Sequence, residues 1–199
     1  MLNLLKVAVT GGLSSGKSTV CQIFRGLGSH IVSADTIVHQ LLSPNTSLGR
    51  KVIKLLGTEI VINQTIDRKS IAKKVFNNPQ LLDQLEKLLH PAVLTEMKKE
   101  YQKAQARSAP LFVAEVPLLF EAGQETWFDI VITVLADEAT QSKLYHSSGF
   151  SEEEYRLRMS RQLTPAQKAE KADYVLLNNG DLANLEKQVI NLYKNLTQS

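Results

Sequence analysis

Several residue types are scarce in this sequence, and each scarcity argues against a class of protein. A single cysteine, Cys21, allows neither an internal disulfide nor a cysteine-rich metal site, so the chain suits a reducing compartment. Because Cys21 lies in a predicted helix, we interpret it as a small core residue rather than a nucleophile. No apolar run approaches the roughly eighteen residues of a membrane-spanning helix, and the first residues lack an export signal. We therefore expect a cytoplasmic protein without a membrane partner.

Neither basic nor acidic residues are in large excess. The 199 residues include 23 basic and 20 acidic ones, a net charge of +3, and 6% are aromatic. Nucleic-acid-binding proteins usually concentrate basic residues on one face and interleave them with aromatic platforms, whereas here the charges are spread along the chain. This composition argues against a nucleic-acid partner. The length fits one domain, or one core with an insertion.

The most informative stretch that is present runs from Gly11 to Ser18 and reads G-x-x-x-x-G-K-S without a mismatch. It follows a predicted strand, Val7–Val9, and precedes a predicted helix over 19–27. In such a loop backbone N–H groups and the helix N-terminus point at phosphate oxygens, while Lys17 reaches the outer phosphates and Ser18 binds magnesium. The residues predicted to bind ATP phosphates are Gly11, Gly12, Leu13, Ser14, Ser15, Gly16, Lys17, Ser18 and Thr19.

Short apolar runs alternate with helical patterns along the rest of the chain. Four further runs are predicted strands, at residues 31–32, 111–114, 130–135 and 174–177. Strands that alternate with helices form right-handed βαβ units, and continuous apolar runs are typical of buried parallel strands. The sequence therefore predicts an α/β fold, a three-layer sandwich with a five-stranded parallel sheet.

The spacing of these strands is uneven. About seventy-five residues separate the second strand, expected to end near Asp35, from the third, far more than a plain crossover needs. Helical periodicity over 48–56, 68–76 and 79–106 predicts a helical acceptor-binding insertion over 46–106. Residues 138–171, rich in basic residues such as Lys168, are predicted to form a lid over the triphosphate or else a solvated helix pair. The core is then 1–45, 107–137 and 172–199, and residues 1–199 form a single domain built around the phosphate-binding loop.

Missing motifs narrow the class of phosphate chemistry. The chain has no Asn-Lys-x-Asp motif for guanine and no Ser-Gly-Gly-Gln-like signature of transporter ATPases. Its size, insertion and basic segment favour a kinase that phosphorylates a small molecule. Two alternatives stay open: a kinase for another nucleoside, nucleotide or metabolite hydroxyl, and a non-catalytic ATP-binding switch protein. The sequence does not indicate an oligomeric state.

Asp35 follows the second predicted strand, at the sheet edge where ligands bind in parallel α/β folds. A carboxylate there can accept or orient the proton of an acceptor hydroxyl during attack on the γ-phosphate. It can equally cap the next helix. Glu115, at the end of the third strand, is a candidate to hold magnesium through water.

Blocks of residues distributed along nearly the whole chain carry a family resemblance. They are Thr10-Gly11-Gly12, Ala34-Asp35, Asp67-Arg68 with Val75-Phe76, Leu89-His90-Pro91, Pro117 to Glu121, Arg158 to Gln162, and Ala172 to Val175 with Asn178 and Gly180. In this order and at these spacings the chain resembles the dephospho-coenzyme A kinase family.

The resemblance implies phosphorylation of the ribose 3′-hydroxyl of dephospho-coenzyme A by magnesium-ATP, the last step of coenzyme A synthesis. It implies that Asp35 is the catalytic carboxylate, that Lys17 neutralises charge on the transferring phosphoryl group, and that Asn178 and Gly180 lie against adenine. The residues expected on the acceptor side are Thr10, Asp35, Arg68, His90, Pro117, Leu118 and Glu121. From local sequence alone, His90 ends a helix before Pro91, and Asn178 to Gly180 form an ordinary turn.

Two positions depart from the family pattern. Ser33 stands where the family often has a first aspartate, which leaves Asp35 as the candidate base of this motif. Lys143 and Ser147 stand nearest to a lid position where the family carries an arginine that contacts ATP. We hypothesise that Arg158 or Arg161 supplies that charge, because arginine suits bidentate phosphate contacts.

Overall fold

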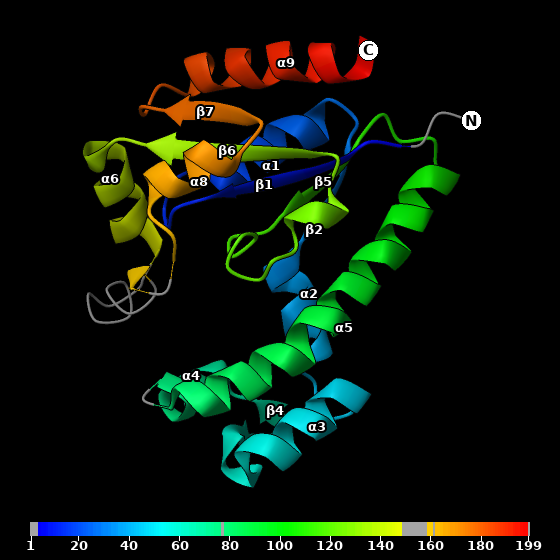
Figure 1. Cartoon of the computed structure of the whole chain (residues 1–199), viewed down its shortest axis with the longest axis vertical. Coiled ribbons are helices and arrows are strands. Elements are labelled where there is room, and N and C mark those ends of the chain that lie inside the picture. The colour runs from blue at the N-terminus through cyan, green and yellow to red at the C-terminus, as the bar shows by residue number, and fades with distance from the viewer. Residues whose placement is uncertain (1–3, 77, 149–158, 161, 199) are drawn as a thin grey trace. The chain divides into compact units, whose positions relative to one another are not determined.

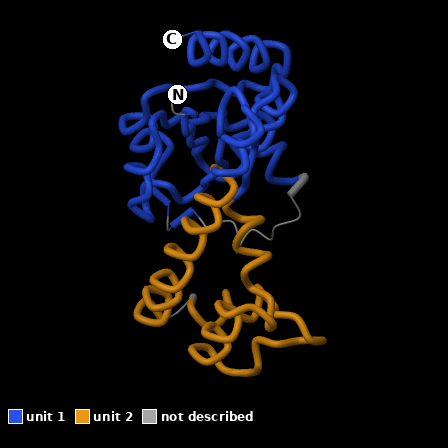
Figure 2. The backbone as a smooth tube through the Cα atoms, turned by 90° about the vertical axis from the view of Figure 1, so that its right-hand side faces the viewer, with its two compact units in different colours: residues 1–33, 102–199 blue, residues 34–101 orange. Residues whose placement is uncertain are grey.

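The structure is a computed structural model that describes residues 4–76, 78–148, 159–160 and 162–198. The chain divides into two compact units (Figure 2). Unit 1 comprises residues 1–33 and 102–199, and unit 2 comprises residues 34–101. The insertion was expected over 46–106. Unit 2 begins before residue 46, at residue 34, and ends before residue 106, at residue 101.

A five-stranded parallel sheet forms the centre of unit 1 (Figure 1). In spatial order its strands are β2 (His30–Ser33), β5 (Phe112–Glu115), β1 (Lys6–Gly11), β6 (Ile130–Ala136) and β7 (Tyr174–Asn178). Each strand coincides with a predicted apolar run, so the predicted α/β fold and the strand number are confirmed. The second strand ends at Ser33, two residues before Asp35, as expected.

The register of the strands brings chemically useful residues to one edge of the sheet. Glu115, the last residue of β5, is in register with Val9 on one side and Ser33 on the other. Asn178 ends β7 opposite Ala136 of β6. Because parallel strands end on the same side, the loop after β1 begins beside these polar residues.

Helices cover both faces of this sheet. On one face α1 (Lys17–Gly26) and α9 (Leu182–Gln198) pack together, and α9 runs along β7 (Figure 1). Their apolar side chains form one core cluster with Val7, Ile132 and other alternate residues of the strands. On the other face α8 (Pro165–Lys171) packs against β1 and β6. Unit 1 also contains η2 (Glu125–Trp127) and α6 (Glu138–Ser148).

Unit 2 is mainly helical and has its own core. Its elements are α2 (Ala34–Leu41), α3 (Ser47–Leu56), η1 (Thr58–Ile60), β3 (Val61–Ile62), β4 (Thr65–Ile66), α4 (Arg68–Phe76) and α5 (Pro79–Ala106), whose last residues belong to unit 1. Val52, Leu56 and Ile60 are among the apolar residues that are buried together. The helices predicted over 48–56, 68–76 and 79–106 are confirmed.

Two features of unit 2 differ from expectation. The hairpin of β3 and β4 was not predicted, because two-residue strands have no detectable periodicity; its turn places Asn63 and Gln64 at positive φ. The helix end expected at His90 is wrong, since α5 continues through Pro91. A proline removes one backbone hydrogen bond, and the long helix tolerates that loss. Within the described residues, no helix is both long and apolar enough to cross a membrane.

Candidate active site

The loop between β1 and α1 has a backbone that requires glycine at two positions. Gly11 has φ +143°, and a Cβ atom there would overlap the carbonyl oxygen of Val134 on β6. Gly16 has φ +93°, and a Cβ atom there would overlap the side-chain amide of Asn178. These two glycines therefore let the loop lie close to its neighbours and turn sharply into the helix.

Lys17 lies folded over this loop. Its Nζ donates to the carbonyl oxygens of Gly12 at 2.6 Å and Gly11 at 3.3 Å, and the residue is 8% exposed. The loop thus holds a positive charge beside its backbone N–H groups, which is the charge distribution that an anionic phosphate chain needs.

Ser18 and Glu115 form a second polar pair at the same strand ends. The Ser18 hydroxyl, in the first turn of α1, donates to Oε1 of Glu115 at 2.8 Å. A hydroxyl and a carboxylate are oxygen donors of the kind that magnesium takes. Among the described residues, no group of three or more histidine, cysteine, aspartate or glutamate side chains is arranged to hold a metal. A metal here would need further oxygen ligands from water or from substrate.

Asn178 connects the last strand of the sheet to the loop. Its Nδ2 donates to the carbonyl oxygen of Ser15 at 3.0 Å, and the residue is buried. The turn that follows contains Gly180 at φ +82°. Sequence reasoning missed this contact because 163 positions separate its two residues, although Asn178 itself was named as an ATP-side residue. The expected contact of Asn178 and Gly180 with adenine stays a prediction.

The loop after β5 is held by hydrogen bonds from several elements. The Pro117 carbonyl accepts from the Thr10 hydroxyl at 3.3 Å and from Lys168 Nζ at 2.7 Å. Glu121 Oε1 accepts from the Leu163 backbone N–H at 2.8 Å and lies 3.0 Å from Lys168 Nζ. Thr10, Pro117 and Glu121, all expected on the acceptor side, thus belong to one hydrogen-bonded group, while Leu118 beside them is 40% exposed.

Lys168 departs from its expected setting. As part of a basic lid or a solvated helix it would face the triphosphate or water, but it is fully buried and ion-paired with Glu121. The physical reason is that α8 packs on the sheet and takes its inner lysine out of water, where a carboxylate partner offsets the lost hydration. Arg158 and Arg161 lie outside the described residues, and the expected lid over 138–171 stays a prediction.

The remaining expected site residues belong to unit 2. Asp35 is exposed and lies within the first turn of α2, where a carboxylate also interacts favourably with the helix dipole. Arg68 is exposed at the start of α4. Asp67 precedes that helix and accepts from the Ser70 hydroxyl and backbone N–H, which lowers the pKa of the Asp67 carboxyl. His90 is half-buried within α5.

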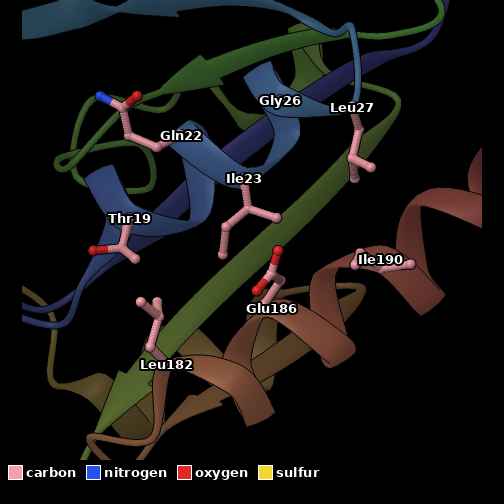
Figure 3. Close-up of a pocket in the computed structure, with 8 residues that line it drawn as sticks. All are labelled: Thr19, Gln22, Ile23, Gly26, Leu27, Leu182, Glu186 and Ile190. Carbon is pink, nitrogen blue, oxygen red and sulfur yellow. The ribbon is translucent and has the colours of Figure 1, made fainter.

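A cavity of about 440 Å³ lies between α1 and α9 (Figure 3). Its lining residues are Thr19, Gln22, Ile23, Gly26, Leu27, Leu182, Glu186 and Ile190. Thr19, expected to bind ATP, lies at one end of it opposite Leu182, which is 59% exposed (Figure 3).

Cys21 lies on the inner face of α1. It is 3% exposed, and burial, followed by the nearby charge of Glu115, raises the pKa of its thiol. The interpretation of Cys21 as a core residue is therefore confirmed.

Comparisons with known proteins agree with one another. The family model described as dephospho-CoA kinase matches residues 5–184. A dephospho-CoA kinase of Protochlamydia amoebophila is 48% identical over 199 residues, which cover 98% of each chain. A Thermus thermophilus protein of known structure aligns with a TM-score of 0.84 at 30% identity, over 98% of this chain and 99% of its own. A dephospho-CoA kinase from Campylobacter jejuni aligns with a TM-score of 0.70 at 26% identity, over 97% of each chain.

Proposed function

Because this chain belongs to the dephospho-CoA kinase family, we propose that Lys17, Ser18 and Asp35 carry the reaction of that family in it. The chain is a kinase of coenzyme A synthesis, with ATP as phosphoryl donor and dephospho-coenzyme A as acceptor. The reaction transfers the γ-phosphoryl group to the ribose 3′-hydroxyl and gives coenzyme A and ADP. A cytoplasmic location for this reaction is part of the proposal, since a chain with a single cysteine forms no internal disulfide.

The donor side of the proposal depends most on one observation, the geometry of the loop from Gly11 to Ser18. Its backbone is shaped by glycines at positive φ, and Lys17 lies over it with its ammonium on two loop carbonyls. When ATP binds, the ammonium can exchange these carbonyls for phosphate oxygens. Lys17 would then neutralise charge that develops on the transferring group, which is the main contribution a protein makes to phosphoryl transfer.

Ser18 and Glu115 fit a magnesium ion at the edge of this loop. Their oxygens are already within 2.8 Å of each other, and both sit at the ends of elements that start or finish beside the loop. Magnesium keeps several waters and binds through one or two protein oxygens plus substrate phosphates, so this small donor set is sufficient. The bound ion would supply charge neutralisation on the phosphate oxygens. Ser18 would hold it directly and Glu115 through water.

On the acceptor side, we assign Asp35 the task of accepting or orienting the proton of the ribose hydroxyl. Support comes from the family resemblance and from its place in the chain, two residues after β2 ends at Ser33. In the proposed assignment Arg68 and His90 bind the acceptor from the insertion over 46–106. The segment 138–171 acts as the lid that excludes water during transfer.

Purified protein mixed with ATP, magnesium and dephospho-coenzyme A tests the activity directly. We expect ADP and coenzyme A in equal amounts by mass spectrometry. Turnover with other hydroxyl acceptors only would support a different small-molecule kinase. Binding of ATP without any turnover would support the switch protein.

The variant Asp35→Asn tests the assignment of the carboxylate. It should lose most of its turnover, about a hundredfold or more, because the amide cannot accept the proton, while the Kd for ATP stays within about twofold. Asp83→Asn is the matched control, since Asp83 forms an exposed ion pair with Lys87 and its loss should leave the rate unchanged. Turnover by Asp35→Asn equal to that of the control would rule out the assigned role.

A further inference from the structure

Unit 1 contains a buried charge that the reaction as described does not use. Lys168 of α8 has a relative exposure of 0%, and its ammonium contacts the Pro117 carbonyl at 2.7 Å and Glu121 Oε1 at 3.0 Å. Lysine is rarely buried completely, because the loss of hydration of its ammonium is unfavourable and must be offset by a paired charge and hydrogen-bond acceptors. Two acceptors on one loop, residues 117–121, compensate the charge here.

The segment that carries Lys168 is anchored on three sides. Its backbone carbonyl accepts from the Thr133 hydroxyl on β6 at 3.1 Å. Pro165, the first residue of α8, lies against the phosphate-binding loop, since a Cβ atom on Gly12 would be 3.5 Å from its Cγ. Leu163 donates its N–H to Glu121. The helix therefore gives the lysine a fixed position from which to hold loop 117–121.

Glu121 depends on this lysine for its charge balance. Its Oε1 accepts a hydrogen bond from the Leu163 N–H and forms the ion pair with Lys168 Nζ. Its Oε2 is buried and has no hydrogen-bond partner among the residues that the structure describes. Without Lys168 the loop would carry an uncompensated carboxylate. Such a charge would repel dephospho-coenzyme A, whose own phosphates are anionic, and the Pro117 carbonyl would lose a partner.

We propose that Lys168 is a positioning residue for the acceptor: its buried ammonium fixes loop 117–121 and neutralises Glu121, so that the loop can receive an anionic substrate. This inference rests on the acceptor-side role proposed above for that loop. The proposal predicts that loss of the lysine weakens the use of dephospho-coenzyme A much more than the use of ATP, although α8 also contacts the phosphate-binding loop through Pro165.

Steady-state kinetics of Lys168→Met, with each substrate varied in turn, test the proposal. We expect the KM for dephospho-coenzyme A to rise about tenfold or more, and the KM for ATP to change by less than about threefold. Lys187→Met is the control, because it removes an exposed lysine from α9 and should leave both KM values unchanged. Equal rises in the two KM values, or a fall in kcat alone, would overturn the proposal.

The double variant Lys168→Met/Glu121→Gln keeps the test decisive if the single variant does not fold. Replacing both members of a buried pair costs far less stability than removing one, so the double variant should fold. Because Glu121 is itself an acceptor-side residue, Glu121→Gln alone is the reference for the double variant. The two should have the same acceptor KM within about twofold, since neither contains an unpaired carboxylate. An acceptor KM of the double variant about tenfold or more above that of Glu121→Gln would show that charge neutralisation is not the role of Lys168. Wild-type turnover of dephospho-coenzyme A, measured first, tests the proposed function separately from these comparisons.

Discussion

Replacing Asn178 with alanine should weaken the use of ATP without touching the acceptor side. The Asn178 amide is buried and donates to the Ser15 carbonyl at 3.0 Å, so it holds the middle of the phosphate-binding loop. Loss of the donor leaves a buried carbonyl without a partner, which costs about 1–3 kcal/mol. Each 1.4 kcal/mol corresponds to a factor of about ten in an equilibrium.

The free energy is lost from the loop conformation that receives phosphate, so it should appear in ATP binding. We expect kcat/KM for ATP to fall between about fivefold and a hundredfold, and the KM for dephospho-coenzyme A to change less than about twofold. Steady-state rates with each substrate varied, and a calorimetric Kd for ATP, measure the two quantities. The Tm of the ligand-free variant, compared with wild type, shows how much of this free energy is lost from the fold in the absence of ATP.

Asn179→Ala is the matched control, since the neighbouring side chain is exposed and the same chemical group is removed. A Tm lowered in Asn178→Ala with kcat/KM for ATP within twofold of the control would refute the reasoning. That outcome would mean that the hydrogen bond stabilises the fold but does not prepare the loop for phosphate.

Two further predictions concern residues at the other strand ends and in the core. Glu115→Gln keeps an oxygen that can accept the Ser18 hydrogen bond but removes the negative charge, so the magnesium concentration that gives half-maximal rate should rise about tenfold or more. A magnesium titration of the rate at saturating ATP measures this concentration. An unchanged value would count against Glu115 as a magnesium residue. Cys21, buried with a raised thiol pKa, should react with iodoacetamide at pH 8 at least about tenfold more slowly in the folded protein than in urea, as mass spectrometry can follow; equal rates would contradict its burial.

Local patterns predicted much of the fold. The apolar runs of β1, β5, β6 and β7 and the periodicity of α3, α4 and α5 are properties of neighbouring residues, so they are readable without tertiary information. The β3–β4 hairpin is too short to produce such a pattern, and Pro91 is a local signal that the long helix around it overrides.

For the site, the sequence identified individual residues but not their partners. Asn178 and Glu121 were named from the family resemblance, yet the contacts that define them are to Ser15, Leu163 and Lys168, which lie far away in the chain. Lys168 was expected in a basic lid or a solvated helix because composition counts its charge and cannot reveal its burial.

By itself, therefore, the sequence determined that this chain holds a triphosphate: the spacing from Gly11 to Ser18 specifies a loop whose backbone does the binding, and that needs only consecutive residues. Only the tertiary structure decided which side chains hold that loop and loop 117–121 in position. The register of the parallel sheet brings Glu115 to Ser18 and Asn178 to Ser15, and packing of α8 on the sheet buries Lys168 against Glu121. These contacts join residues from separate strands and helices, and only the folded sheet brings such residues together.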